Sequence, residues 1–347
     1  MSSDSDESTV DKDIDVSTAN TMRERAGENR LKLWILLSAN RLVLTGILTL
    51  AMFLVFVVSV TVLPSPLSPQ LSSGDTIDTL FSTMITVIIT GTTLVVTIGQ
   101  LVISGENGSL GEQRERMENS MDFRDSTEEL IGAPSPADPS TFLQGIIEVS
   151  QDRAEAVRDG LSDIDNDQLQ WEIDEFTESL IGNSETVRDR LEGAQFGSFD
   201  VMHAALDYNY AWKIFQVERL LYDYEEDLGE PENELLNELK TALSMFGPAR
   251  EHVKTLYFEW VLVTLSQLIL YAAIPALAVA GIMVTAVDIG AVTGSTLSVE
   301  NITWLIGAAF SITLLPFFLF TAYVSRIVGI AKRTLAIEPL ILRESQR

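Results

Sequence analysis

The sequence contains no cysteine and only two histidines, His203 and His252. The absence of cysteine excludes disulfide bonds, thiol catalysis, iron–sulfur clusters and cysteine-based zinc sites. Neither histidine belongs to a recognisable nucleophile or metal-binding motif. The chain also lacks a glycine-rich phosphate loop ending in Lys-Ser or Lys-Thr, an HExxH motif, and a GxGxxG motif after a predicted strand. We therefore expect neither an enzyme nor a cofactor.

Positive charge is scarce as well: 23 Lys and Arg stand against 50 Asp and Glu, and the formal net charge is -27. This acidic excess resembles the composition of halophilic, archaeal-type proteins, which function in molar salt. At such ionic strength the Debye length falls to about 3 Å, so repulsion between carboxylates costs little. An ordinary acidic protein is the alternative. In both cases the acidic surface repels phosphates, so we expect no nucleic-acid partner.

Long apolar segments are present in spite of this charge. Four of them lack Asp, Glu, Lys, Arg and His: residues 42–63, 79–105, 260–287 and 302–325. Each is long enough to cross about 30 Å of hydrocarbon as a helix. Only helices and closed barrels satisfy main-chain polar groups in lipid, and these segments are too long and too continuously apolar for barrel strands. The sequence therefore predicts four transmembrane helices.

The distribution of Lys and Arg predicts the orientation. Residues 64–78 and 288–301 contain neither, so every cation lies on the other side of the predicted membrane. By the positive-inside rule that side is the cytoplasm. We predict a multi-pass protein of the cell membrane with cytoplasmic N- and C-termini. Residues 1–30 are polar and acidic, without the apolar core of a signal peptide, and are expected to form a disordered cytoplasmic tail.

The predicted fold is all-α, with four transmembrane helices arranged as two hairpins, over residues 31–105 and 256–326. A helical cytoplasmic domain, residues 106–255, is inserted between the hairpins. Residues 327–347 form a cytoplasmic C-terminal tail.

Inside the predicted cytoplasmic domain, Asp138 followed by Pro139 indicates a helix start. Further helices are expected over residues 168–181, closed by Gly182–Asn183, and over residues 199–224. A break is expected at Gly247–Pro248, where the two residue types least favourable to a helix stand together.

The second predicted span carries a polar stripe. Its members recur at alternating spacings of three and four residues: Thr83, Thr86, Thr90, Thr93, Thr97, Gln100 and Ser104. This spacing places them on one face of a helix. The opposite faces hold Ile85, Ile88, Ile89, Leu94, Val95, Val96 and Ile98. A polar face in a membrane must meet protein or water.

Two interpretations of the stripe remain open. In one, the small hydroxyl residues let helices pack closely, and each threonine bonds back to its own helix. In the other, copies of this helix in a homo-oligomer surround a water-filled path. Carboxylates, lysines and histidines are absent from all four spans, which disfavours a proton- or ion-coupled transporter.

Three further positions are candidates for a role. Pro275 and Pro316 lie inside the third and fourth predicted spans, where each acts either as a structural kink or as a hinge. Asn301 begins an Asn-Ile-Thr sequence on the predicted outer side and is a candidate glycosylation site.

The order of two hairpins around a cytoplasmic helical domain resembles the layout of bestrophin-type anion channels, pentamers lined by their second helix. No motif is shared, and the Phe-ringed neck of that family is not apparent in the second span. We expect a bilayer protein that forms homo-oligomers and conducts ions, with the second span lining the axis. The alternative is a membrane-anchored sensor or scaffold whose cytoplasmic domain binds a protein partner.

Overall fold

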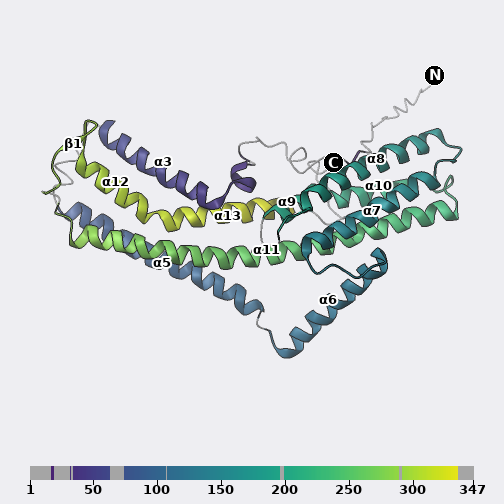
Figure 1. Ribbon diagram of the computed structural model, residues 1–347, viewed down its shortest axis with the longest axis horizontal. Coiled ribbons are helices and arrows are strands. Elements are labelled where there is room, and N and C mark those ends of the chain that lie inside the picture. The colour runs from purple at the N-terminus through teal and green to yellow at the C-terminus, as the bar shows by residue number, and fades with distance from the viewer. Residues whose placement is uncertain are drawn as a thin grey trace, which may run out of the picture. The chain divides into compact units, whose positions relative to one another are not determined.

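The structure is a computed structural model that describes residues 17–18, 32, 34–62, 74–106, 108–195, 199–288 and 291–334. Nearly all of these residues are helical, and the sheet found among them is one short hairpin (Figure 1). The predicted all-α class is confirmed. The chain divides into two compact units. Unit 1 contains Phe123–His252 together with Ser17 and Thr18, and unit 2 contains the described residues of Asn29–Asp122 and Val253–Leu335.

Unit 1 is built from helices that each bury one face. They are the end of α6 (Leu110–Ile131), α7 (Pro139–Gly160), α8 (Asp167–Leu191), α9 (Phe199–Asp207), α10 (Tyr210–Asp223) and the first part of α11 (Glu230–Thr285). Helix α7 begins as predicted, because Pro139 is its first residue and the Asp138 carboxylate accepts hydrogen bonds from the main-chain N–H of Ser140 and Thr141. Its apolar face packs on α8 and α9.

Helix α8 passes through Gly182–Asn183, where the sequence predicted its end, and continues to Leu191. Asn183 is buried, and its amide accepts a hydrogen bond of 2.8 Å from Lys213 Nζ and donates one of 3.3 Å to the main-chain oxygen of Asp207. The prediction was wrong because these tertiary contacts hold Asn183 inside the core, so it does not cap the helix.

The predicted break at Gly247–Pro248 is also wrong, because α11 is continuous there. A Cβ atom on Gly247 would lie 3.0 Å from the ring of Tyr210, so the glycine permits close packing between α11 and α10. Pro248 faces solvent and removes a main-chain donor without ending the helix. Conversely, the single helix expected over residues 199–224 is divided into α9 and α10 at Tyr208–Asn209.

Unit 2 contains the apolar helices. Its elements are η1 (Trp34–Ser38), α3 (Arg41–Val62), α5 (Gly74–Glu106), the second part of α11, β1 (Ser295–Thr296), β2 (Val299–Glu300), α12 (Asn301–Thr313) and α13 (Leu315–Thr334). Among the described residues, four helices are long and apolar enough to cross a membrane: Arg41–Val62, Thr76–Val102, Glu230–Thr285 and Leu315–Lys332. The chain therefore has the helices of an integral membrane protein.

The fourth predicted span, residues 302–325, is interrupted. Helix α12 ends at Thr313 and α13 begins at Leu315, one residue before Pro316. Proline has no N–H to donate, and its ring crowds the preceding turn, so the hydrogen bond that the residue-316 N–H would make across this point is missing. Pro275, in contrast, lies inside α11 without interrupting it.

The helices of unit 2 pack through small and apolar side chains. Helices α12 and α13 lie along α3, and α5 lies along α11 (Figure 1). A Cβ atom on Gly307 of α12 would lie 3.0 Å from the Phe56 ring of α3, so glycine is needed for this approach. Phe81 of α5 is fully buried beside Met283 of α11 and Ile306 of α12.

The first of the long apolar helices has a defined start. The side chain of Asn40 accepts hydrogen bonds from the main-chain N–H of Leu42 and Val43, at 2.9 Å and 3.3 Å, and so caps α3. The apolar residues before it form the π-helix η1 and do not extend α3.

Both predicted tails lie mostly outside the described residues. Within the predicted N-terminal tail, Ser17 and Thr18 belong to unit 1 and contact α8 and α10. The predicted C-terminal tail, residues 327–347, includes the last part of α13, which reaches Thr334.

Candidate functional site: the polar face of α5

The seven residues of the polar stripe all lie on α5, and all seven side chains are exposed in the chain. They are Thr83, Thr86, Thr90, Thr93, Thr97, Gln100 and Ser104. The stripe begins at Thr83, inside the candidate span Thr76–Val102, and extends just past the end of that span to Ser104. No described helix of unit 2 therefore covers this face.

The opposite face of α5 binds the rest of unit 2. Ile77, Phe81 and Ile88 are buried against residues of α11, and Ile77 and Phe81 also meet α12. Of the apolar residues that the sequence placed opposite the stripe, Ile88 is buried and Ile85, Val95 and Val96 are half-buried. Ile89, Leu94 and Ile98 are exposed. Helix α5 is thus held by one face and leaves both the polar stripe and part of its apolar surface uncovered.

Gly99 marks a close approach between α5 and α11. A Cβ atom there would lie 2.5 Å from Ser266 Oγ and 3.3 Å from Ser266 Cβ. Ser266 in turn donates a hydrogen bond of 2.9 Å to the main-chain oxygen of Leu262. Gly99 was not among the residues predicted from the sequence, although its place on the side of the helix away from Thr97 was a usable signal, since small residues in membrane helices often mark contacts.

Four threonine hydroxyls of the stripe are bonded to their own helix. Thr83, Thr86, Thr93 and Thr97 donate to the main-chain oxygens of Thr79, Ser82, Ile89 and Thr93, at 2.7, 3.2, 2.8 and 2.8 Å. Each hydroxyl hydrogen is therefore satisfied in any environment, and each oxygen keeps a lone pair for another donor or a cation. Gln100 carries an amide, whose two N–H groups and oxygen need partners outside such a local bond.

An apolar groove of about 410 Å³ lies beside the stripe. It is formed by α5 from Met84 to Ile98, by Ile269 of α11, and by residues 313–320 at the junction of α12 and α13. Pro316 is among its lining residues, so the candidate hinge of the fourth span faces α5. The groove separates the interrupted helix from the exposed surface of α5.

The other two predicted positions lie apart from the stripe. Pro275 is exposed on α11. Asn301 is the first residue of α12, and its Nδ2 donates a hydrogen bond of 3.1 Å to the main-chain oxygen of Thr293, while its Oδ1 accepts one of 2.7 Å from Thr296. A glycan attached to Nδ2 would replace one of its two hydrogens and leave the other to donate to Thr293.

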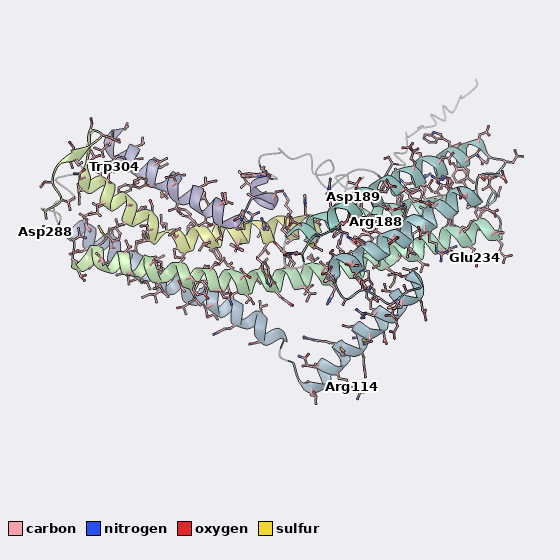
Figure 2. All side chains as sticks on the ribbon, viewed as in Figure 1. Arg114, Arg188, Asp189, Glu234, Asp288 and Trp304 are labelled. Carbon is pink, nitrogen blue, oxygen red and sulfur yellow. The ribbon has the colours of Figure 1, made fainter. Side chains whose placement is uncertain are left out.

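The two ends of unit 2 differ chemically. Asp288 and Trp304 lie at the end that carries the β1–β2 hairpin, whereas Arg114 follows the opposite end of α5 (Figure 2). Trp304 donates a hydrogen bond of 3.3 Å to the Thr296 oxygen, and its ring lies 5.7 Å from that of Phe53. An amphipathic tryptophan at the end of an apolar helix is typical of the interface between hydrocarbon and headgroups.

No group of three or more His, Asp or Glu side chains that could hold a metal ion occurs in the part of the chain that the structure describes. The candidate site is therefore a polar surface within an apolar unit, and its chemistry is that of hydroxyl and amide groups.

Comparison with known proteins identifies the family of the chain. No curated protein and no solved structure matches it. Residues 7–347 match a family of unknown function, DUF7972, and this range includes both units and every described helix. The protein belongs to this family of unknown function.

Proposed function

We propose that the chain is one protomer of a homo-oligomeric membrane protein in which copies of α5 surround a water-filled path for ions. One observation carries the proposal: the whole polar stripe of α5 is exposed, while the other face of the same helix is packed. Packing within a single chain therefore does not account for the stripe. A second copy of the chain, or water held by several copies, supplies the polar environment that hydrocarbon lacks.

The proposed topology follows the distribution of cations. Residues 64–78 and 288–301 contain no Lys or Arg and lie outside the cell, and the region between α5 and α11 lies in the cytoplasm with both termini. Helices α3 and α5 form the first hairpin. The second half of α11 forms the second hairpin with α12 and α13, which cross together as one span bent at Leu314.

A membrane-anchored sensor or scaffold is the second candidate. The observation in its favour is that unit 1 has an extensive core of its own, with Leu143, Ile146 and Phe176 among its fully buried residues. In this case the stripe only packs copies of α5 together, and unit 1 binds a protein partner.

Oligomeric mass in detergent at high salt, measured by light scattering, separates these candidates first. A closed ring of four or more copies supports a shared axial path, whereas a monomer or dimer contradicts it. Conductance of the reconstituted protein then provides the direct test. We expect Thr90→Leu and Thr93→Leu to reduce conductance at least about tenfold if these side chains line the path, and Ile89→Leu, an exposed apolar position on the same helix, to leave it unchanged. Absence of conductance in the unsubstituted protein at every tested potential and salt would favour the scaffold.

A further inference from the structure

Unit 1 contains a lysine ammonium with no exposure to solvent. Lys213 of α10 is 0% exposed. Its Nζ donates a hydrogen bond of 2.8 Å to Asn183 Oδ1 and one of 3.3 Å to the main-chain oxygen of Thr18, and it lies 4.6 Å from the centre of the Tyr208 ring. A buried charge requires such partners, because it has given up its hydration. One of the groups that replace this hydration, the main-chain oxygen of Thr18, belongs to the N-terminal segment of the chain.

Thr18 and its neighbour Ser17 make further contacts with α8 and α10. Trp212 Nε1 donates a hydrogen bond of 3.2 Å to the main-chain oxygen of Ser17. The main-chain N–H of Thr18 donates to Ser179 Oγ at 3.0 Å, and the hydroxyls of Thr18 and Ser179 lie 3.1 Å apart. Thr18 is only 1% exposed. Two successive carbonyls, one N–H and one hydroxyl of the segment are therefore bound by side chains of unit 1.

These contacts have the form of peptide recognition. Ser17 and Thr18 belong to neither a helix nor a strand, and three of the four groups bound are main-chain groups. Side chains that bind the main chain of a short segment and enclose one small side chain select an extended peptide with a Ser or Thr at the enclosed position. The polar sequence around Thr18 predicted no such contact.

We propose that unit 1 carries a binding site for an extended peptide, and that its ligand is the N-terminal segment of the same chain around Ser17–Thr18, bound reversibly. A few hydrogen bonds and one enclosed threonine give weak binding by themselves. The covalent connection raises the effective concentration of the segment to about the millimolar range, so the site is filled within the chain and remains exchangeable. This inference does not depend on ion conduction.

Disulfide cross-linking in the full-length protein tests whether Thr18 lies beside Ser179 of the same chain. The natural chain has no cysteine, so Thr18→Cys with Ser179→Cys creates a single possible pair within one chain. We expect mild oxidation to form an intramolecular disulfide in most molecules, seen as a mobility shift on a non-reducing gel. The matched control combines Thr18→Cys with Ser162→Cys, which lies beyond the start of α8 and about 18 Å or more from Ser179 along that helix. A cross-linked dimer, or equal cross-linking in the control, would overturn the proposal.

Peptide binding tests reversibility. A fluorescent peptide of residues 12–24 is added to the full chain and to a variant that lacks residues 1–20, and anisotropy reports binding. We expect the shortened variant to bind the peptide at least about tenfold more tightly than the full chain, whose site is occupied. In the shortened variant, Lys213→Met should weaken binding about tenfold or more. Lys240→Met, at a half-buried lysine of unit 1 that pairs with Glu218, should have no effect.

Further measurements test the proposal if one of these variants does not fold. If Lys213→Met does not fold, Trp212→Phe takes its place. Trp212→Phe removes one N–H donor and keeps an aromatic ring, so we expect a smaller loss of peptide affinity. Circular dichroism establishes whether the shortened variant is folded. A folded shortened variant that does not bind the peptide, or a full chain that binds it equally well, would contradict the proposal. If the shortened variant is unfolded, slow cross-linking of the Thr18→Cys, Ser179→Cys pair relative to its control would also contradict it.

Discussion

The guanidinium of Arg41, the first residue of α3, donates a hydrogen bond of 3.3 Å to the main-chain oxygen of Ala322 in α13. The same side chain donates to the oxygens of Ile35 and Leu36 in η1, at 2.8 and 2.9 Å. Arg326 of α13 donates in the opposite direction, to the oxygen of Ala39, at 2.7 Å. Two arginines thus bind main-chain oxygens at the point where η1, α3 and α13 meet.

Replacing Arg41 with Lys should destabilise this junction. A guanidinium presents several N–H groups in a planar fork and reaches three main-chain oxygens at once, whereas a lysine ammonium is a compact donor that cannot match this geometry. We expect Arg41→Lys to lower the free energy of unfolding by about 2 kcal/mol, measured as a lower melting temperature in detergent. Arg114→Lys, at an exposed position, is the control and should leave the melting temperature unchanged.

Two glycines of α5 should respond to alanine with opposite signs. In Gly99→Ala the new Cβ displaces Ser266 Oγ, so we expect a loss of about 1–2 kcal/mol. In Gly91→Ala the Cβ meets nothing within 4 Å, and the better helix propensity of alanine should stabilise by up to about 1 kcal/mol. Thermal unfolding measures both. Adding Ser266→Ala to Gly99→Ala should restore most of the loss, and failure of this rescue would show that Ser266 is not the obstacle.

The turn between β1 and β2 has two non-glycine residues at positive φ, a conformation that their side chains disfavour. Leu297 and Ser298 have φ angles of 52° and 65°, which cost a non-glycine residue about 1 kcal/mol or more each. Leu297→Asn with Ser298→Gly supplies the residue types that this turn favours. We expect slower hydrogen exchange at the Thr296 and Val299 amides. Unchanged or faster exchange would mean that the hairpin does not adopt this turn.

Unit 1 should lose stability at high pH through Tyr208. Burial raises the pKa of Tyr208 from its ordinary value of 10.0 to about 12. Because the folded state favours the neutral phenol, the corresponding stabilisation is complete below about pH 10 and is lost as the pH rises toward 12. The free energy of unfolding should therefore fall across this interval. In Tyr208→Phe the free energy of unfolding should fall less steeply with pH. An identical dependence on pH in both proteins would contradict the assignment of this effect to Tyr208.

Periodicity and charge predicted much of the architecture, because apolar runs and the residues that begin a helix are local signals. The apolar segments and the start at Asp138 are seen in the structure. Helix ends were less predictable. Asn183 and Gly247 favour helix ends by residue type, but each has a partner distant in sequence, Lys213 or Tyr210, that holds it inside a helix.

The candidate site was predictable only as a pattern. Spacing alone places the stripe on one face of α5, but it does not say which face meets α11. That choice depends on Phe81, Ile88 and Gly99, whose shapes fit the neighbouring helices. The contact of Thr18 with Lys213 had no local signal, because a segment held by its main chain needs no apolar periodicity.

The hydrogen bonds inside α5 have a consequence for selectivity. Thr83, Thr86, Thr93 and Thr97 have already given their hydroxyl hydrogens to main-chain oxygens. Towards its surroundings each therefore presents a methyl group and an electron-rich oxygen, but no hydrogen for an anion to accept. A surface of this kind solvates a partly dehydrated cation better than chloride, so along these four residues the local helix geometry of threonine would favour cations, and the N–H groups of Gln100 are the donors that an anion could still use.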